Sequence, residues 1–189
     1  MRRMGPEDSY IREIDPHEVE ASENDGEIGE EAFIEITKKL VPGLRVRRTT
    51  ELEDAGKLHI GHGQETDTVS YWPEGPKIPA SAWQITVGFS RENIQKKMES
   101  LMNKPFATIE GRSIPRVVVP LDRSEAKTFL SDLDLDQHKK LVEQFFEGTI
   151  NSLRFVILRT KDPKLKAQAE KELERFLALK EEWQNKETK

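Results

Sequence analysis

The 189-residue chain contains no cysteine, which excludes disulfide bonds and thiolate metal sites. No apolar run approaches the roughly 20 residues of a membrane-spanning helix, and the first ten residues, MRRMGPEDSY, lack the apolar core of a secretory signal. Only 35% of the residues are hydrophobic and 7% aromatic, against 34% charged. We therefore expect a soluble, intracellular protein, cytoplasmic or nuclear, with no membrane contact and one folded domain.

The net charge of -5 is unevenly distributed along the chain. Residues 1–31 hold 11 acidic and 3 basic residues, residues 32–121 hold 10 acidic and 13 basic residues, and residues 122–189 hold 14 of each. An acidic tail beside a basic centre is compatible with a nucleic-acid surface for which the tail competes. A solvated tail next to an ordinary charged surface explains the same distribution.

Three regions differ in pattern. Residues 1–26 have no sustained periodicity and end in SENDG, so we predict a disordered acidic lead-in. Residues 27–160 are predicted to form an α/β domain. Residues 161–189 are predicted to form a long amphipathic helix after an Asp162-Pro163 start, packing on the domain or on a protein partner. Its apolar stripe consists of Leu165, Ala169, Leu173, Phe176, Leu177 and Trp183.

The order of elements predicts a mixed sheet flanked by helices. A helix from Ile28 to Leu40 precedes strands at 44–50, 67–71 and 83–89, with a loop at 51–66. A helix after Ser90 and a buried, β-branched strand at 114–121 follow. Further helices are predicted from Asp122 and over 136–147, whereas residues 151–160 fit either a strand or a continued helix.

The stretch Asp67–Phe89 combines a strand pattern with polar side chains. Trp83, Ile85, Val87 and Phe89 alternate with polar or small residues, which predicts a half-buried strand. If this run pairs with the one that Asp67 opens, the side chains of Gln84 and Thr86 point toward Asp67. Asp67 shares its parity with apolar residues, a local conflict that often marks a site. A strand-start aspartate bonded to its loop explains it equally well.

Acidic residues of the first predicted helix fall into two groups. Glu27, Glu30 and Glu31 lie in its first turn, where negative charge suits the helix dipole. Glu35 lies past the first turn, at the edge of the apolar stripe, where its carboxylate can lean over the sheet.

These residues resemble a known superfamily. Glu35 on the first helix, Asp67 at the second strand and Gln84-Ile85-Thr86 on the third resemble the restriction-endonuclease-like PD-(D/E)xK nucleases. Within that superfamily, AWQITVGFSRENI followed by RVVVPLDRSEAKTF is similar to the nuclease-like domains of Crinkler and retrotransposon-hot-spot effector proteins. The resemblance covers about residues 28–130. It implies a restriction-endonuclease-like α/β (α+β) fold, here with a helical C-terminal part, and metal-dependent cleavage of nucleic acid.

The resemblance also implies a site. Mg²⁺ or Mn²⁺ would be held by Asp67, with Glu35 or Glu31 in support and Gln84 as a neutral oxygen ligand. Thr86 stands where the family has a lysine, and a hydroxyl cannot supply that positive charge. Lys96 or Lys97 on the next helix would have to provide it. The alternative is a non-catalytic effector or protein-interaction module on the same fold.

A second kind of metal site is also compatible with the sequence. His59 and His62, in HIGHG, lie near Glu65 and Asp67, and imidazole with carboxylate is a ligand set for transition metals. A polar loop without a metal explains the same residues.

Overall fold

The computed structural model describes residues 16–54, 66–75, 77–88 and 91–187. Within them, five strands form one mixed sheet in the order β1-β2-β3-β5-β4. The strands are β1 (Arg45–Arg48), β2 (Thr68–Tyr71), β3 (Pro79–Val87), β4 (Phe106–Ile109) and β5 (Arg112–Leu121). The helices are α1 (Pro16–Leu40), α2 (Thr49–Asp54), α3 (Arg91–Asn103), α4 (Arg123–Asp132), α5 (Lys139–Arg159) and α6 (Pro163–Glu187). The predicted mixed α/β architecture is confirmed.

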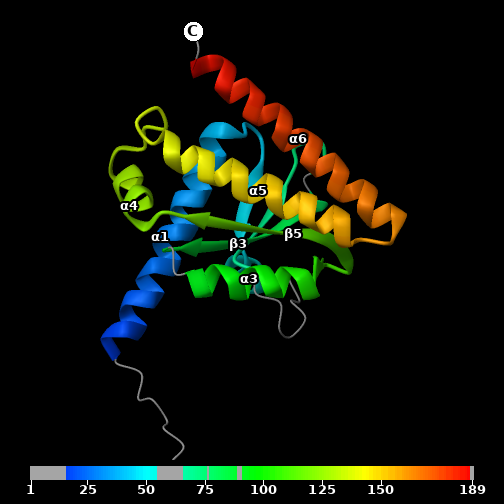
Figure 1. Ribbon diagram of the computed structural model, residues 1–189, viewed down its shortest axis with the longest axis horizontal. Coiled ribbons are helices and arrows are strands. Elements are labelled where there is room, and N and C mark those ends of the chain that lie inside the picture. Colours follow the sequence, from blue (N-terminus) through cyan, green and yellow to red (C-terminus); the bar gives the residue numbers. More distant parts are fainter. Residues whose placement is uncertain (1–15, 55–65, 76, 89–90, 188–189) are drawn as a thin grey trace, which may run out of the picture.

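The connectivity places β3 at the centre of the sheet. β1, β2 and β3 pair antiparallel in sequence order, whereas β3 and β5 pair parallel, with Ile85 opposite Val119. A parallel pair needs a crossover connection, and α3 provides it. Figure 1 shows α3 on the other side of the sheet from α5 and α6.

An aromatic cluster fills the core on the α1, α5 and α6 side of β3. The indole ring of Trp83 lies 5.0 Å from the ring of Phe33, 5.5 Å from Phe176 and 6.3 Å from Phe145. These four side chains come from three helices and one strand, and each is fully buried. Each such burial contributes on the order of 2 kcal/mol or more to stability, so the cluster joins the C-terminal helix to the sheet.

The prediction of a half-buried third strand was wrong. Gln84 and Thr86, expected on an open face, are 2% and 6% exposed. The α3 crossover covers this second face, as is usual for parallel strands. β3 is therefore buried on both faces from Pro79 to Thr86.

The predicted start of the first helix was also wrong. α1 begins at Pro16 rather than near Ile28, so residues 16–26 are helical and only residues 1–15 of the predicted lead-in lie outside the described residues. Gly29 then lies in the interior of the helix, against β3. A Cβ at this position would meet Val87 Cγ2 at 2.3 Å, so only glycine permits this approach.

Other elements differ from the predicted ones in their bounds. Residues 49–54, expected to end a strand and begin a loop, form α2, and β4 was not predicted. The ambiguous segment 151–160 continues α5 through Arg159. The Ser152 hydroxyl donates to the Val118 carbonyl at 3.1 Å and accepts from its amide at 3.0 Å, which satisfies strand groups that the ladder leaves unpaired.

Two helix starts agree with prediction. Asp122 caps α4 by accepting a hydrogen bond from the Glu125 amide at 3.1 Å. Asp162 accepts from the Lys164 amide at 2.8 Å, directly before α6 begins at Pro163. No helix among the described residues contains an apolar stretch long enough to cross a membrane.

Candidate functional site at the Asp67 edge of the sheet

The predicted pairing of the two strands around Asp67 is confirmed. β2 and β3 are antiparallel with Thr68 opposite Trp83, and Asp67 directly precedes β2. The Asp67 amide donates to the Trp83 carbonyl at 2.8 Å, so the backbone contact between the two segments extends past the end of β2. Asp67 therefore lies beside β3, next to Trp83.

The Asp67 carboxylate is held in place by the backbone. Its Oδ2 accepts a hydrogen bond from the Ile85 amide at 2.6 Å. From the other side, the Thr49 amide donates to the Asp67 carbonyl at 3.0 Å, and the Thr49 hydroxyl donates to the Thr66 carbonyl at 2.8 Å. The carboxylate thus has a fixed position with a short, charge-assisted bond.

A second carboxylate, Glu30 of α1, interacts with Asp67. Burial raises the pKa of Glu30 above its usual range, and the negative charge of Asp67 raises it further, while Arg48 opposes the rise. Glu30 Oε2 lies 3.5 Å from Arg48 Nε. A nearby negative charge disfavours the ionised form of a carboxyl, and a cation or proton between the two would relieve this.

Three buried hydroxyls lack a hydrogen-bond partner in the described part of the chain. Two of them, Thr66 and Thr68, flank Asp67 in sequence, and the third, Thr86, follows Ile85 on β3. Native proteins rarely leave buried polar atoms unsatisfied, and an ion or water that belongs to the site is one explanation. The orphaned hydroxyls therefore mark the Asp67 edge as a place for a polar ligand.

A buried cation lies next to Gln84. Arg116 of β5 is 2% exposed, and its Nη2 donates to Gln84 Oε1 at 3.4 Å. Its Nη1 donates to the Lys104 carbonyl at 2.9 Å, and it also bonds to Ser100, so the guanidinium closes the C-terminal end of α3. Sequence reasoning missed Arg116, although a charged residue inside the apolar run IPRVVVPL was a visible signal.

The structure distributes the other predicted site residues over separate surroundings. Glu35 forms an ion pair with Lys38 one turn along α1, and Glu31 is exposed. Lys96 pairs with Glu92 at 2.9 Å on the exposed side of α3, and Lys97 is half-buried. Among the described contacts it is Glu30, not Glu31 or Glu35, whose charge is coupled to Asp67.

Glu30 was missed for an identifiable reason. Starting the helix at Ile28 placed Glu30 in the first turn, where the helix dipole accounts for an acidic residue. Because α1 begins at Pro16, Glu30 lies in the helix interior and faces Arg48 and Asp67. The only sequence signal was its position directly after Gly29, the close-approach glycine.

The alternative histidine site lies outside the described residues. His59, His62 and Glu65 all fall in the segment 55–65. Within the described ranges, no three His, Cys, Asp or Glu side chains come close enough to form a metal-binding group.

No protein-family model matches the chain, and neither a curated protein nor a solved structure matches it significantly. Residue roles therefore have to come from the geometry of the site itself.

Proposed function

We propose that this chain is a divalent-metal-dependent nuclease-like protein that acts on or binds nucleic acid through the Asp67 edge of its sheet. The connectivity supports this: a helix, three antiparallel strands, a crossover helix and a strand parallel to the third follow one another. That order is the one of the restriction-endonuclease-like fold that the sequence resembles. β4, α2 and the C-terminal helices are additions to it.

The coupled carboxylates of Asp67 and Glu30 are the observation that carries the proposal. Carboxylate oxygens are the ligands that Mg²⁺ and Mn²⁺ prefer. A bound ion would lower the pKa of a coordinated water and stabilise charge on a phosphate. The chain's own contribution is to hold Asp67 against the Ile85 amide and to bring Glu30 close through α1.

A specific observation favours a second candidate, a non-catalytic module on the same fold. The Arg116 guanidinium donates to the Gln84 oxygen that a metal would need, and Thr86 offers a hydroxyl where the family has a lysine. A buried cation beside a ligand disfavours a divalent ion there. In this candidate, the Asp67 edge keeps the fold while another surface binds a nucleic-acid or protein partner.

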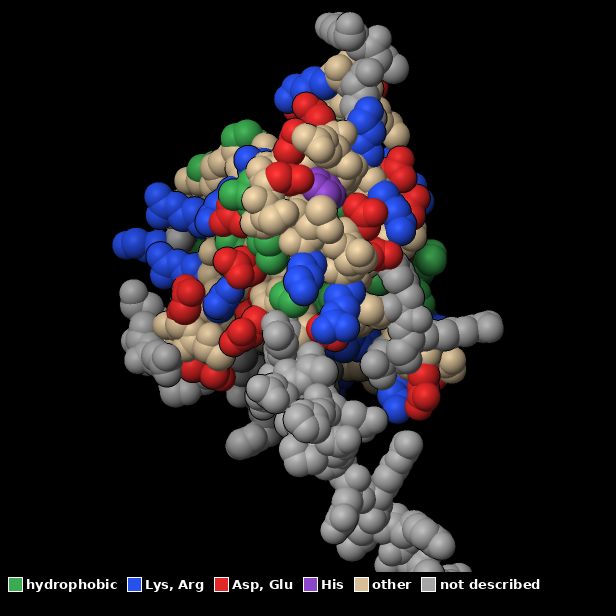
Figure 2. Space-filling view, turned by 90° about the vertical axis from the view of Figure 1, so that its left-hand side faces the viewer, with side chains coloured by type: hydrophobic (Ala, Val, Ile, Leu, Met, Phe, Trp, Pro, Cys, Tyr) green, Lys and Arg blue, Asp and Glu red, His purple; other side chains and the backbone are tan. Residues whose placement is uncertain are grey.

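The charged surface bears on the nucleic-acid partner. Figure 2 shows the face around α4, where Lys and Arg side chains lie among Asp and Glu side chains rather than forming a patch of one sign. Nucleic-acid affinity depends on clustered cations that neutralise phosphates. A nucleic acid would therefore contact another face.

Cleavage assays with matched variants test the proposal. The purified chain is incubated with plasmid, single-stranded DNA and RNA in Mg²⁺ or Mn²⁺. We expect Asp67→Asn to lower the rate by about 100-fold or more, because it removes the principal metal ligand. Glu30→Gln should reduce activity less, and Glu31→Gln, one residue along α1 and exposed, should leave it unchanged.

Mn²⁺ binding, followed by water relaxation, provides a readout independent of cleavage. Wild-type binding that Asp67→Asn abolishes supports the metal site even if the substrate is wrong. Absence of Mn²⁺ binding in a folded wild type would rule the metal site out and favour the non-catalytic module. Cleavage unaffected by Asp67→Asn would place the chemistry elsewhere.

A further inference from the structure

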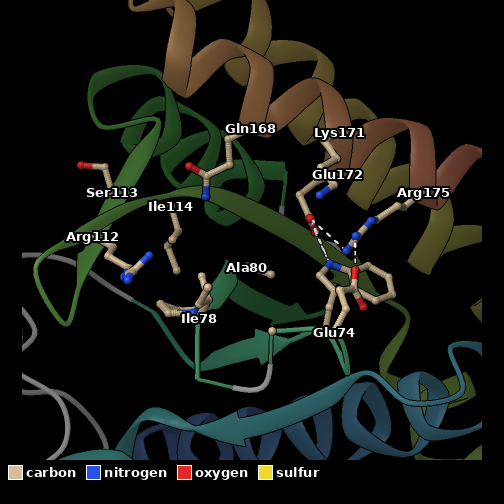
Figure 3. A pocket seen from close by; sticks show the side chains of 13 residues that line it. Glu74, Ile78, Ala80, Arg112, Ser113, Ile114, Gln168, Lys171, Glu172 and Arg175 are labelled. Carbon is tan, nitrogen blue, oxygen red and sulfur yellow. Dashed lines mark hydrogen bonds and ion pairs between the residues drawn. The ribbon is translucent and has the colours of Figure 1, made fainter.

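A cavity of about 560 Å³ lies between α6 and the connection from β2 to β3 (Figure 3). Ile78, Ala80 and Ile114 form its apolar floor, from the turn, β3 and β5. Its size is within the range of about 300–1,000 Å³ that small-molecule sites occupy. It uses neither Asp67 nor Glu30, so it is independent of the proposed nuclease site.

One end of the cavity is saturated by contacts within the protein. The buried Glu172 of α6 accepts from Trp72 Nε1 at 2.9 and 3.0 Å and from the Ser81 hydroxyl at 3.4 Å. The Arg175 guanidinium lies 4.4 Å above the Trp72 ring and pairs with Glu74. Figure 3 shows these groups directed toward one another. The charged groups at this end are thus largely engaged with one another.

The other end is lined by polar groups that lack partners. Arg112, Ser113 and Gln168 line this end, and within the described part of the chain none of their side chains makes a hydrogen bond or ion pair. Figure 3 shows Arg112 and Gln168 well separated from the Glu172 network, whereas Lys171 lies beside Glu172, where its positive charge lowers the pKa values of Glu74 and Glu172. Arg112 and Gln168 thus offer donors beside an apolar floor, which is the usual composition of a small-molecule site.

The charges of the lining limit the ligand. The cations Arg112, Lys171 and Arg175 face the carboxylates Glu74 and Glu172, so the lining carries a net charge of +1. A monoanion balances this charge, whereas a dianion would be repelled by the two carboxylates. The guanidinium fork matches the geometry of a carboxylate.

We propose that this cavity binds a small organic carboxylate with an apolar body. The carboxylate accepts hydrogen bonds from Arg112 and Gln168, with Lys171 supplying further positive charge. The apolar body lies on Ile78, Ala80 and Ile114. Neutral or cationic analogues of the same shape leave the donors without an acceptor and bind less well.

Titration with 3-phenylpropionate tests the proposal, followed by ¹⁵N–¹H spectra and calorimetry. We expect shifts confined to residues of the cavity, and affinity at least about tenfold above that of 3-phenylpropionamide, the cost of losing one charge-assisted contact. Phenyl phosphate should bind no more tightly than the carboxylate. Arg112→Gln and Lys171→Gln should each weaken binding, whereas Lys166→Gln, also exposed on α6, should not.

Several results would overturn the proposal. Equal affinity for the acid and the amide would show that the donors play no part. Undiminished binding by Arg112→Gln, with the variant's melting curve unchanged, would exclude the assigned anion position. No saturable binding up to about 10 mM would mean an affinity below that of ordinary fragments. Arg112 and Lys171 are exposed, so we expect their replacement to leave the fold intact. The melting curves of the variants test this.

Discussion

Glu30 and Glu172 are both glutamates whose pKa burial raises, but their neighbours are of opposite kinds. Beside Glu30 the next largest influence is the carboxylate of Asp67, which raises the pKa further. Beside Glu172 the Trp72 indole N–H, Arg175 and Ser81 all lower it again. One carboxylate is therefore left in conflict with its surroundings, and the other is satisfied by them.

The difference separates a candidate site from a structural connection. Unfavourable electrostatic contacts lower the stability of the fold, and proteins retain them mainly where a function requires them. Glu172 instead accepts hydrogen bonds from Trp72 and Ser81 and pairs with Arg175, and these contacts attach α6 to the sheet. Burial and a raised pKa alone would have ranked the two glutamates alike.

The largest expected effect comes from removing the satisfied carboxylate. Glu172→Leu leaves the Trp72 N–H and Ser81 hydroxyl buried without their acceptor, which costs about 1–3 kcal/mol of unfolding free energy. Chemical denaturation measures this loss. Glu172→Gln, which keeps an acceptor oxygen, serves as the matched variant and should lose less. Equal losses in both would show that packing, rather than hydrogen bonding, holds α6 here.

The stability difference between Glu172→Gln and wild type should depend on pH, because the pKa of Glu172 is raised. Because the pKa of Glu172 lies above its unfolded value of 4.5, the folded state binds the proton more tightly. Its contribution to stability is complete below that value and is lost as pH rises through the folded pKa, by about 1.4 kcal/mol for each unit of the difference. Stability of Glu172→Gln relative to wild type should therefore improve as pH rises from 4. An unchanged difference would show that Glu172 is not shifted.

Replacing Glu30, the carboxylate that Asp67 repels, should raise the stability of the protein rather than lower it. Glu30→Gln removes repulsion from Asp67 and keeps a polar group near Arg48, so we expect a small gain in stability at pH 7. Glu31→Gln, exposed on the same helix, is the control. Thermal melting at low salt provides the measurement. A clear loss of stability would mean that the Arg48 contact outweighs the repulsion.

The smallest effect is expected at His138, where a cation lies between carboxylates. Burial lowers the pKa of His138, but the hydrogen bonds that its ring donates to Asp132 at 3.0 Å and to Glu125 at 3.3 Å raise it overall above 6.5. Stability from this group is complete below 6.5 and is lost as pH rises through the folded pKa. His138→Gln should flatten that part of the curve. The same slope in wild type and variant would assign it to another group.

Local patterns predicted the parts of this fold that depend on neighbouring residues. The strand around Trp83, the Asp162-Pro163 helix start and the helix start at Asp122 were confirmed because each rests on a few adjacent side chains, although the strand is buried on both faces rather than one. The pairing of the strand that follows Asp67 with the strand that holds Gln84 was predicted, and the register confirms it. The role of Asp67 as a metal ligand stays a prediction.

The remaining features depend on residues far apart in the chain. Trp72 and Glu172 are separated by 100 positions, and no local pattern relates them. Arg116 reaches Gln84 only because β5 lies parallel to β3. Glu30 was missed because the predicted start of α1, Ile28, lies well inside the helix, which begins at Pro16. Candidate sites made by long-range pairing need the topology before their members can be recognised.

The docking of α6 also has a consequence for synthesis of the chain. Phe176 completes the aromatic cluster around Trp83, and Glu172 supplies the acceptor for Trp72, yet both belong to α6, which is translated after the sheet. Until α6 has left the ribosome, the nascent chain carries an open apolar surface over β3, and the Trp72 N–H lacks its acceptor. Such surfaces bind chaperones and other unfinished chains. The interval between synthesis of the sheet and docking of α6 is therefore one in which the chain is prone to aggregation.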